Sequence, residues 1–329
     1  MRFSVSVCLG TIGWLLAAGG LVAQPTPPAQ PPSGPGGAEE TFHDIAAAHY
    51  GAGDTEYWLF EPRDPRPAHA PVIVFLHGWS VMNTIPYQGW INHLVGRGAI
   101  VIYPRYHATL RTRAATFTAH AQGAVEAAFA ELETGDHVRP ELDHIAFAGH
   151  SMGGMIAANL AALADGKKLP HPAVLFCAEP GKVIGDFPIH NEDLSKIPAS
   201  TLLVTLAGDA DKIVGDFDAR RIYRGTTAIP PENKNFVILH SDAHGHRPLV
   251  ANHIASCALV SDAIPFFSRW LETDALDYYG TWKLLDGLTD AAFYGTDRAY
   301  ALGDTPQQRF MGRWSDGVPV HPLEVVAKP

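Results

Sequence analysis

One stretch near the middle of the chain limits the possible folds more than any other. An apolar run at 145–148 is followed by Gly-His-Ser-Met-Gly-Gly at 149–154, and residues 155–163 are rich in alanine and leucine. The apolar run predicts a buried strand, and the alanine-rich segment predicts a helix. We therefore expect Ser151 at a sharp turn between strand and helix, where glycines allow close packing. The alternative is a glycine-rich turn in which the serine is incidental.

Further apolar runs alternate with amphipathic segments along the chain. Strands are expected at 55–62, 71–76, 99–103, 173–177, 201–206 and 236–239, and helices at 87–97, 116–134 and 264–271. Strands that alternate with helices predict an α/β fold, with a mostly parallel central sheet covered by helices on both faces.

The composition excludes some classes of function. The chain has 329 residues, of which 47% are hydrophobic and 18% charged, enough for one large domain. Its formal net charge is −10 and no basic cluster occurs, which argues against nucleic acid and an anionic membrane surface as partners. Beyond the N-terminus, no stretch is long and apolar enough to span a bilayer, so no stable membrane insertion is expected.

The N-terminus has the pattern of a targeting segment. Arg2 precedes an apolar stretch at 5–16, and small residues follow up to Ala23. This layout predicts a signal peptide at 1–23, cleaved after Ala23, and hence a secreted or periplasmic protein; the alternative is an uncleaved signal anchor. A proline- and glycine-rich segment follows, which we expect to be a flexible linker over 24–39.

The remaining chain is divided into a catalytic domain at 40–271 and a C-terminal extension at 272–329 that packs on the same domain. Once the signal is removed, only Cys177 and Cys257 remain. Two buried free thiols are favoured over a disulfide, and no structural zinc site is expected from so few cysteines.

A serine nucleophile needs a carboxylate-oriented histidine as its base. The carboxyl ends of parallel strands meet at one edge of a sheet, so both partners should follow later strands. After the strand at 201–206, Asp211 precedes the apolar pair at 213–214, which would anchor its loop, and we predict it as the acid. Asp209 is the second choice and Glu179 a more distant one.

The base is expected shortly after the strand at 236–239. His244 lies a short loop beyond that strand and is followed by a glycine, so we predict it as the base, with His246 as the second choice. These two histidines could also suggest a metal pair, but no third ligand type lies nearby, so no metal is expected.

The loop at 77–79 follows the buried strand at 71–76. In such a position the backbone N–H of Trp79 can face that of Met152, so that both stabilise a developing oxyanion. The alternative is an ordinary turn at a strand end with a packed tryptophan.

Together, the loop at 77–79, Ser151, Asp211 and His244 resemble the α/β-hydrolase superfamily in their chain order, over residues 55–271. The Gly-His-Ser-Met-Gly-Gly motif looks like those of dienelactone hydrolases, cutinases and bacterial polyester hydrolases. The resemblance implies the α/β-hydrolase fold, acyl transfer through an acyl-enzyme and no cofactor. It also implies that the aromatic residue at position 79 donates its N–H and flanks the substrate.

The segment between the strands at 173–177 and 201–206 is too short for a large lid domain, which favours an open site. His77, Tyr87 and Trp90 are candidate substrate-binding residues, with core packing as the alternative for the aromatic pair. The leading hypothesis is a hydrolase of small-molecule or polymeric carboxylic esters. Amide cleavage or acyl transfer by the same residues is the alternative within enzymes, and a non-catalytic binding protein is the alternative from another class.

Overall fold

The computed structural model describes residues 24–182, 189–260 and 271–329. The expected signal peptide and all but the last residue of the helix expected at 264–271 lie outside these ranges. Within them, one nine-stranded sheet has the order β1-β2-β4-β3-β5-β6-β7-β8-β9. Strands β4, β3, β5, β6, β7 and β8 run parallel to one another, and β1, β2 and β9 add antiparallel edges. The sheet is therefore mostly parallel, as predicted.

The strands are β1 (Asp44–Tyr50), β2 (Tyr57–Asp64), β3 (His69–Leu76), β4 (Ile100–Pro104), β5 (Arg139–His150), β6 (Val174–Ala178), β7 (Leu202–Gly208), β8 (Lys234–Leu239) and β9 (Glu324–Val325). The α-helices are α1 (Gln88–Gly96), α2 (Phe117–Leu132), α3 (Met152–Leu163), α4 (Phe217–Gly225), α5 (Lys283–Tyr294) and α6 (Pro306–Arg309). A π-helical turn, Asp277–Trp282, leads directly into α5.

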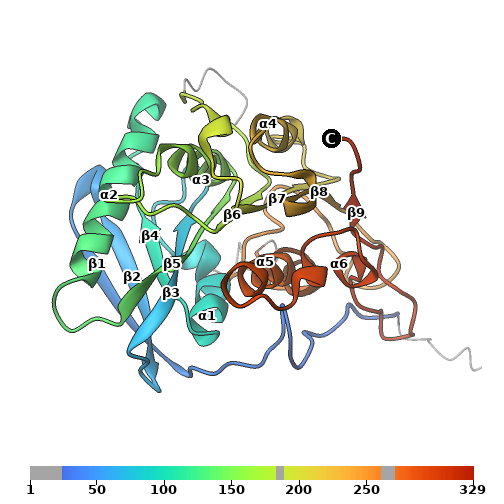
Figure 1. The fold of residues 1–329 in the computed structure, drawn as a ribbon. Coiled ribbons are helices and arrows are strands. Elements are labelled where there is room, and N and C mark those ends of the chain that lie inside the picture. Colours follow the sequence, from blue (N-terminus) through green and yellow to red (C-terminus); the bar gives the residue numbers. More distant parts are fainter. Residues whose placement is uncertain (1–23, 183–188, 261–270) are drawn as a thin grey trace, which may run out of the picture.

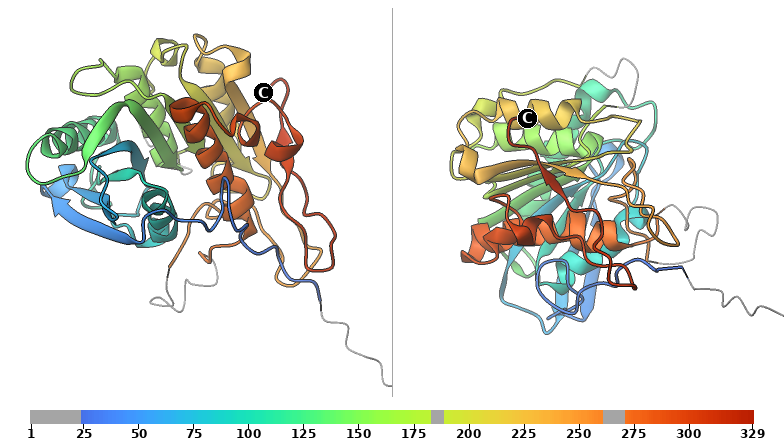
Figure 2. Two further views of the ribbon diagram at one scale, coloured as in Figure 1. Left: turned by 60° about the horizontal axis from the view of Figure 1, so that its bottom comes forward. Right: turned by 90° about the vertical axis from the view of Figure 1, so that its right-hand side faces the viewer.

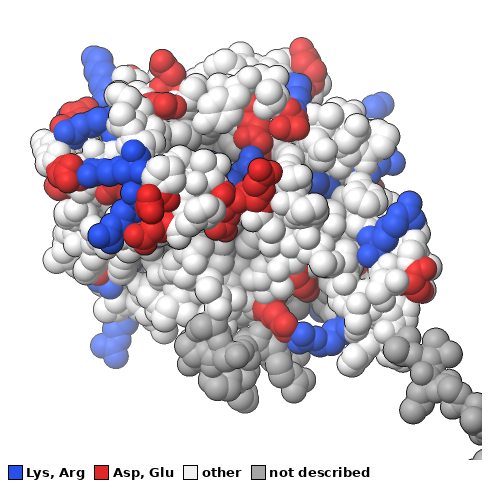
Figure 3. All heavy atoms as spheres, turned by 90° about the horizontal axis from the view of Figure 1, so that it is seen from below, with Lys and Arg blue, Asp and Glu red and all other residues white. Residues whose placement is uncertain are grey.

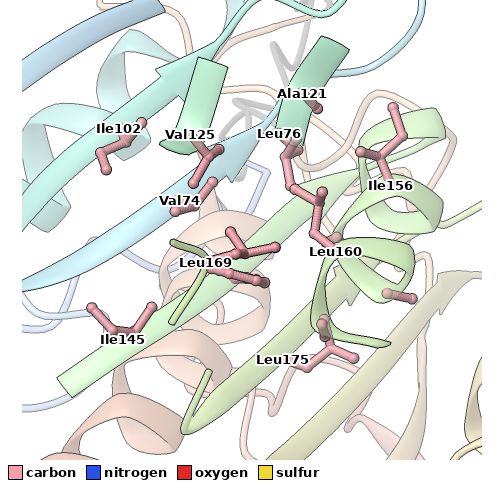
Figure 4. Packing of buried hydrophobic residues seen from close by; sticks show 14 of the residues in the cluster. Val74, Leu76, Ile102, Ala121, Val125, Ile145, Ile156, Leu160, Leu169 and Leu175 are labelled. Carbon is pink, nitrogen blue, oxygen red and sulfur yellow. The ribbon is translucent and has the colours of Figure 1, made fainter. Parts of the chain in front are cut away.

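Helices cover both faces of the sheet: α2, α3 and α4 lie on one face and α1 and α5 on the other (Figures 1 and 2). Successive residues of a strand point to opposite faces, so β3 contributes to both layers. Val72, Val74 and Leu76 pack under α2 and α3, whereas Ile73 and Phe75 pack under α1. Figure 4 shows part of the first layer. Because both faces are buried, the central strands are continuous apolar runs, which is why their positions were readable from the sequence.

Two strands near the ends of the chain, β1 and β9, were not predicted. Strand β1 was missed because its run of alanines has weak strand propensity. The C-terminal segment adds α5 to the α1 layer and pairs β9 with β8, so it is part of the same packed unit. Cys177 and Cys257 are free and buried, as expected from the sequence.

The segment predicted to be a flexible linker is instead docked on the protein. We call residues 24–38 the N-terminal strap, which passes beneath α1 and α5 in Figure 1. Its backbone exchanges hydrogen bonds with Ser315, and the carbonyl of Pro25 accepts from the His246 N–H at 2.7 Å. Although prolines and glycines cannot build a core, their carbonyls and remaining N–H groups can bind the folded body. The prediction considered only side chains, and for that reason it was wrong.

Charged side chains of both signs lie next to one another on the face shown in Figure 3, and much of that face carries neither sign. None of the helices in the described ranges combines the length and apolar character needed to cross a bilayer.

Asp286 of α5 anchors the strap from inside the protein. It is 1% exposed and accepts hydrogen bonds from Gly36 N at 2.7 Å and His93 Nε2 at 2.8 Å, with Arg97 Nε at 3.4 Å. Asp286→Ala should lower the free energy of unfolding by roughly 3–5 kcal/mol, because it leaves buried polar groups unpaired. Urea unfolding measures this loss, and limited proteolysis should show faster cleavage of the strap.

Asp304→Asn is the matched control, since Asp304 pairs with Arg309 at the surface and should contribute less than about 1 kcal/mol. Equal effects of the two substitutions would contradict the anchoring role of Asp286.

Candidate active site

Ser151 stands at the turn between β5 and α3, where the sequence placed it. Its backbone has φ 58° and ψ −127°, a conformation that side-chain-bearing residues rarely adopt. The surrounding backbone maintains it: Ser151 N–H donates to the Ala178 carbonyl at 2.9 Å, and the Ser151 carbonyl accepts from Gly154 N at 3.0 Å and Gly181 N at 3.2 Å. The serine is therefore held at the carboxyl end of β5, above the sheet.

Two glycines of the motif are required by close backbone contacts. A Cβ on Gly149 would lie 2.4 Å from the Gly153 carbonyl group, and a Cβ on Gly153 would lie 2.1 Å from the Leu76 carbonyl oxygen. Contacts this short exclude any side chain, so the N-terminus of α3 reaches the ends of β5 and β3 only because these positions are glycine.

Ser151 is hydrogen-bonded to a histidine that is in turn bonded to an aspartate. The Ser151 hydroxyl lies 2.8 Å from His253 Nε2, and His253 Nδ1 lies 2.8 Å from Asp211 Oδ2. All three side chains are buried. Since Asp211 can only accept when ionised, Nδ1 carries the proton and Nε2 accepts from the serine hydroxyl. This is the arrangement that lets a histidine withdraw a proton from a serine.

Asp211 occupies the loop after β7, as predicted from the apolar pair that follows it. Its Oδ1 accepts from Ile213 N at 2.8 Å and Val214 N at 3.1 Å, which leaves Oδ2 for His253. Burial acts to raise the pKa of Asp211, but the His253 hydrogen bond and the two N–H groups hold that pKa below its usual value. Asp209 instead accepts from Ser241 and His240, so it shapes the next loop.

The prediction of His244 as the base is wrong, because His244 does not contact Ser151. His244 pairs with Asp316 at 2.8 Å on the surface, and the second choice, His246, is also exposed. Both belong to a turn closed by backbone pairing of Asp242 with Leu249. The chain passes through this turn before it returns to the site, so the residue that reaches Ser151 is His253.

A signal for His253 was present in the sequence. His244 and His246 lie among glycine, aspartate and arginine, whereas His253 lies in a mostly apolar stretch, 248–258. A base that must be buried against the sheet needs such neighbours. Distance from the preceding strand was the wrong criterion, because a strand can be followed by a long excursion.

The loop at 77–79 runs directly past the serine. A Cβ on Gly78 would lie 3.3 Å from Ser151 Cβ and 3.1 Å from the Tyr87 hydroxyl oxygen. Trp79 is half-buried and packs against the core layer that contains α3. Met152 is the first residue of α3, whose N-terminus begins beside Ser151. The loop and the helix end thus flank the serine from two sides.

The three side chains predicted to bind substrate lie in the protein interior. His77 stacks on Tyr106 with ring centroids 4.2 Å apart, and Trp90 packs against Phe75. Tyr87 is also fully buried. Direct substrate contact is therefore not what this structure shows for His77, and for Tyr87 and Trp90 it shows core packing, the alternative given above.

A second buried carboxyl group, Glu179, follows β6. Its Oε2 accepts from the Ser256 hydroxyl at 2.6 Å and lies 3.5 Å from His150 Nε2, so it is not the carboxylate that pairs with His253. Burial raises the pKa of Glu179 to about 8, and the Ser256 hydrogen bond lowers it only in part. Asp211 and Glu179 therefore differ in charge at neutral pH, as their surroundings dictate.

A cavity of about 720 Å³ lies beside the loop that carries His253. Asn252 and Ile254 line it from one side and residues 26–30 of the N-terminal strap from another. The strap thus forms one wall of this cavity. Within the described ranges, no group of three or more His, Cys, Asp or Glu is placed to hold a metal ion.

Glu179 should make stability depend on pH. Above about pH 4.3 the unfolded chain has released this proton while the folded protein keeps it up to about pH 8, so the free energy of unfolding falls as pH rises through that window. Glu179→Gln should reduce the slope by about one proton, or roughly 1.4 kcal/mol per pH unit. Urea unfolding from pH 5 to 8 measures it. Glu133→Gln, at an exposed position, should leave the slope unchanged, and identical slopes for all three proteins would refute the assignment.

Comparison with known proteins agrees with this architecture. The family model described as Chlorophyllase matches residues 59–180, less than half of the chain. Among solved structures, Thermogutta terrifontis esterase 2 phosphorylated by paraoxon is similar, with a TM-score of 0.53 and 17% identity over 76% of this chain and 95% of that one. No curated protein sequence matches. The chain therefore has the α/β-hydrolase fold.

Proposed function

We propose that the protein is a serine hydrolase of carboxylic esters in which Ser151 is the nucleophile, His253 the base and Asp211 the residue that orients the base. The observation that carries the proposal is the continuous hydrogen-bonded chain between these three buried side chains, with both distances at 2.8 Å. The match to the Chlorophyllase family model and the likeness to an esterase phosphorylated by paraoxon support ester chemistry at a serine.

The reaction follows from the arrangement. Ser151 Oγ attacks the ester carbonyl carbon while His253 Nε2 takes the hydroxyl proton, and the ionised Asp211 stabilises the imidazolium. The tetrahedral intermediate collapses, the C–O bond to the alcohol breaks, and His253 gives its proton to the departing alcohol. Water then attacks the acyl-enzyme with His253 again as base, which releases the acid and restores Ser151.

We propose the backbone N–H groups of Trp79 and Met152 as donors to the oxyanion. The support is positional: Gly78 lies against Ser151, and the N-terminus of α3, where backbone N–H groups and the helix dipole favour negative charge, begins at Met152. Losing one such donor typically costs on the order of 10²–10³ in turnover.

We also propose that the protein is exported, on the strength of the signal-peptide pattern at 1–23 alone.

The identity of the base distinguishes this proposal from its alternatives. His253→Ala should reduce kcat for a p-nitrophenyl ester on the order of 10⁴-fold or more, as Ser151→Ala should, because each removes a member of one proton-transfer unit. His244→Ala should stay within a few-fold of wild type, since His244 pairs with Asp316 at the surface. A fluorophosphonate should label wild type but not Ser151→Ala. Full activity in His253→Ala, or no labelling of folded wild type, would contradict the proposal.

The acid is tested by a pair of similar substitutions on one loop. Asp211→Asn should lower kcat on the order of 10⁴-fold, because an amide no longer holds His253 with its proton on Nδ1. Asp209→Asn should cost less than about tenfold, because the Asp209 side chain hydrogen-bonds to the turn at 240–241 and not to His253. Both are measured on the same ester, with circular dichroism as the check on folding. A larger loss in Asp209→Asn would assign the acid role to that residue.

A further inference from the structure

His150, the residue before the nucleophile, makes two side-chain hydrogen bonds that the proposed chemistry does not use. It is 3% exposed, lies under the site and is not open to substrate. Its Nε2 lies 2.7 Å from the backbone carbonyl oxygen of His253, and its Nδ1 lies 2.8 Å from the Tyr87 hydroxyl. The Tyr87 oxygen lies 2.9 Å from the backbone N–H of Gly78.

The direction of each hydrogen bond is determined by its neighbours. A backbone carbonyl can only accept, so Nε2 of His150 carries a proton and donates to His253. Burial and the nearby His253 lower the pKa of His150 to about 3, so the ring is neutral and its Nδ1 accepts from the Tyr87 hydroxyl. That hydroxyl oxygen in turn accepts from Gly78 N–H. The chain of bonds is fully specified.

This chain joins three loops that meet at the serine. It begins at the backbone of the base, passes through a side chain adjacent to Ser151, and ends at the residue before Trp79, the proposed oxyanion donor. His150 is rigidly tied to Ser151, because the strained turn and the packed glycines leave the β5–α3 junction little freedom. The hydrogen bonds through His150 therefore fix the positions of the other two loops relative to Ser151.

The loop that carries His253 needs a restraint of this kind. His253 is separated from β8 by residues 240–252. This segment contains no helix and a single isolated backbone bridge, between Asp242 and Leu249. Catalytic groups must be held within about 0.5 Å of their productive positions, which a long irregular segment does not achieve alone. The bond from His150 Nε2 is made to the backbone of the catalytic residue itself, where it restrains the ring most directly.

We propose that His150 and Tyr87 are positioning residues that hold the base and the oxyanion loop in register with Ser151. The inference rests on the proposed ester hydrolysis. The chemistry itself would still proceed through Ser151, His253 and Asp211. We call the hydrogen bonds that run from the His253 carbonyl through His150 and Tyr87 to Gly78 the relay. Loss of the relay should lower kcat more than it raises KM.

The test compares two buried tyrosines. Tyr87→Phe removes the hydroxyl that joins His150 to Gly78 and should lower kcat for a p-nitrophenyl ester roughly 10- to 100-fold, with KM changed less than about threefold. Tyr103→Phe is the matched control: Tyr103 is also fully buried, and its hydroxyl donates to the Asn83 carbonyl at 2.7 Å, outside the relay. It should keep kcat within about threefold of wild type, although both substitutions remove one buried hydrogen-bonding hydroxyl and should destabilise to a similar degree.

A second pair of variants tests His150 without relying on Tyr87. His150→Leu should lower kcat at least as much as Tyr87→Phe, and His150→Gln, whose amide can donate to the His253 carbonyl, should recover part of that loss. The rate of fluorophosphonate labelling should fall in parallel with kcat, because it reports the same geometry of serine and base.

Equal kcat in Tyr87→Phe and Tyr103→Phe, in an active wild type, would overturn the positioning role and leave the proposed function intact. So would a loss in Tyr87→Phe that appears only in KM, or a His150→Gln variant no better than His150→Leu. A folded wild type that reacts with neither ester nor fluorophosphonate would overturn the proposed function and this inference with it.

Discussion

The close approach of α3 to the ends of β3 and β5 is the constraint on which the rest of the site depends. Positions 149 and 153 must lack a Cβ for the helix to begin where it does, and that start forces Ser151 into its strained conformation. The strain is supported by backbone hydrogen bonds from the ends of neighbouring strands, so the parallel sheet maintains it. Every other group at the site is positioned relative to this one turn.

Near this turn, the surroundings of Asp211, Glu179 and His150 give these ionisable groups different charges at neutral pH. Asp211 keeps its charge because three donors face it, whereas Glu179 is buried with a single hydroxyl partner and holds its proton. His150 is neutral for the same reason of burial. One ionised carboxylate therefore faces His253, while its neighbours contribute hydrogen bonds without net charge. A second negative charge near the histidine would compete with Asp211 for the same imidazolium.

The parts of the site that could be predicted from the sequence are those determined by local contacts. Ser151 follows a buried strand and precedes a helix, and Asp211 lies between a strand end and an apolar pair that anchors its loop. His253 was missed because a strand pattern does not encode the length of the excursion that follows it. For Tyr87 and Trp90 the sequence left substrate binding and core packing as alternatives, because composition does not show which face of an element points inward. The strap was misread because its contacts are made by backbone atoms, which hydropathy does not register.

The docked strap also has a consequence for the order in which the protein can fold. Its bonding partners lie far later in the chain, and for Asp286, Tyr279 and Ser315 the separation is 250 to 289 positions. During synthesis the strap must therefore remain undocked until nearly all of the protein has been made. Contacts of such long sequence separation form late, after most of the loop-closure entropy has been lost. One wall of the cavity beside the 252–254 loop is thus completed by a segment that is synthesised early and docks late.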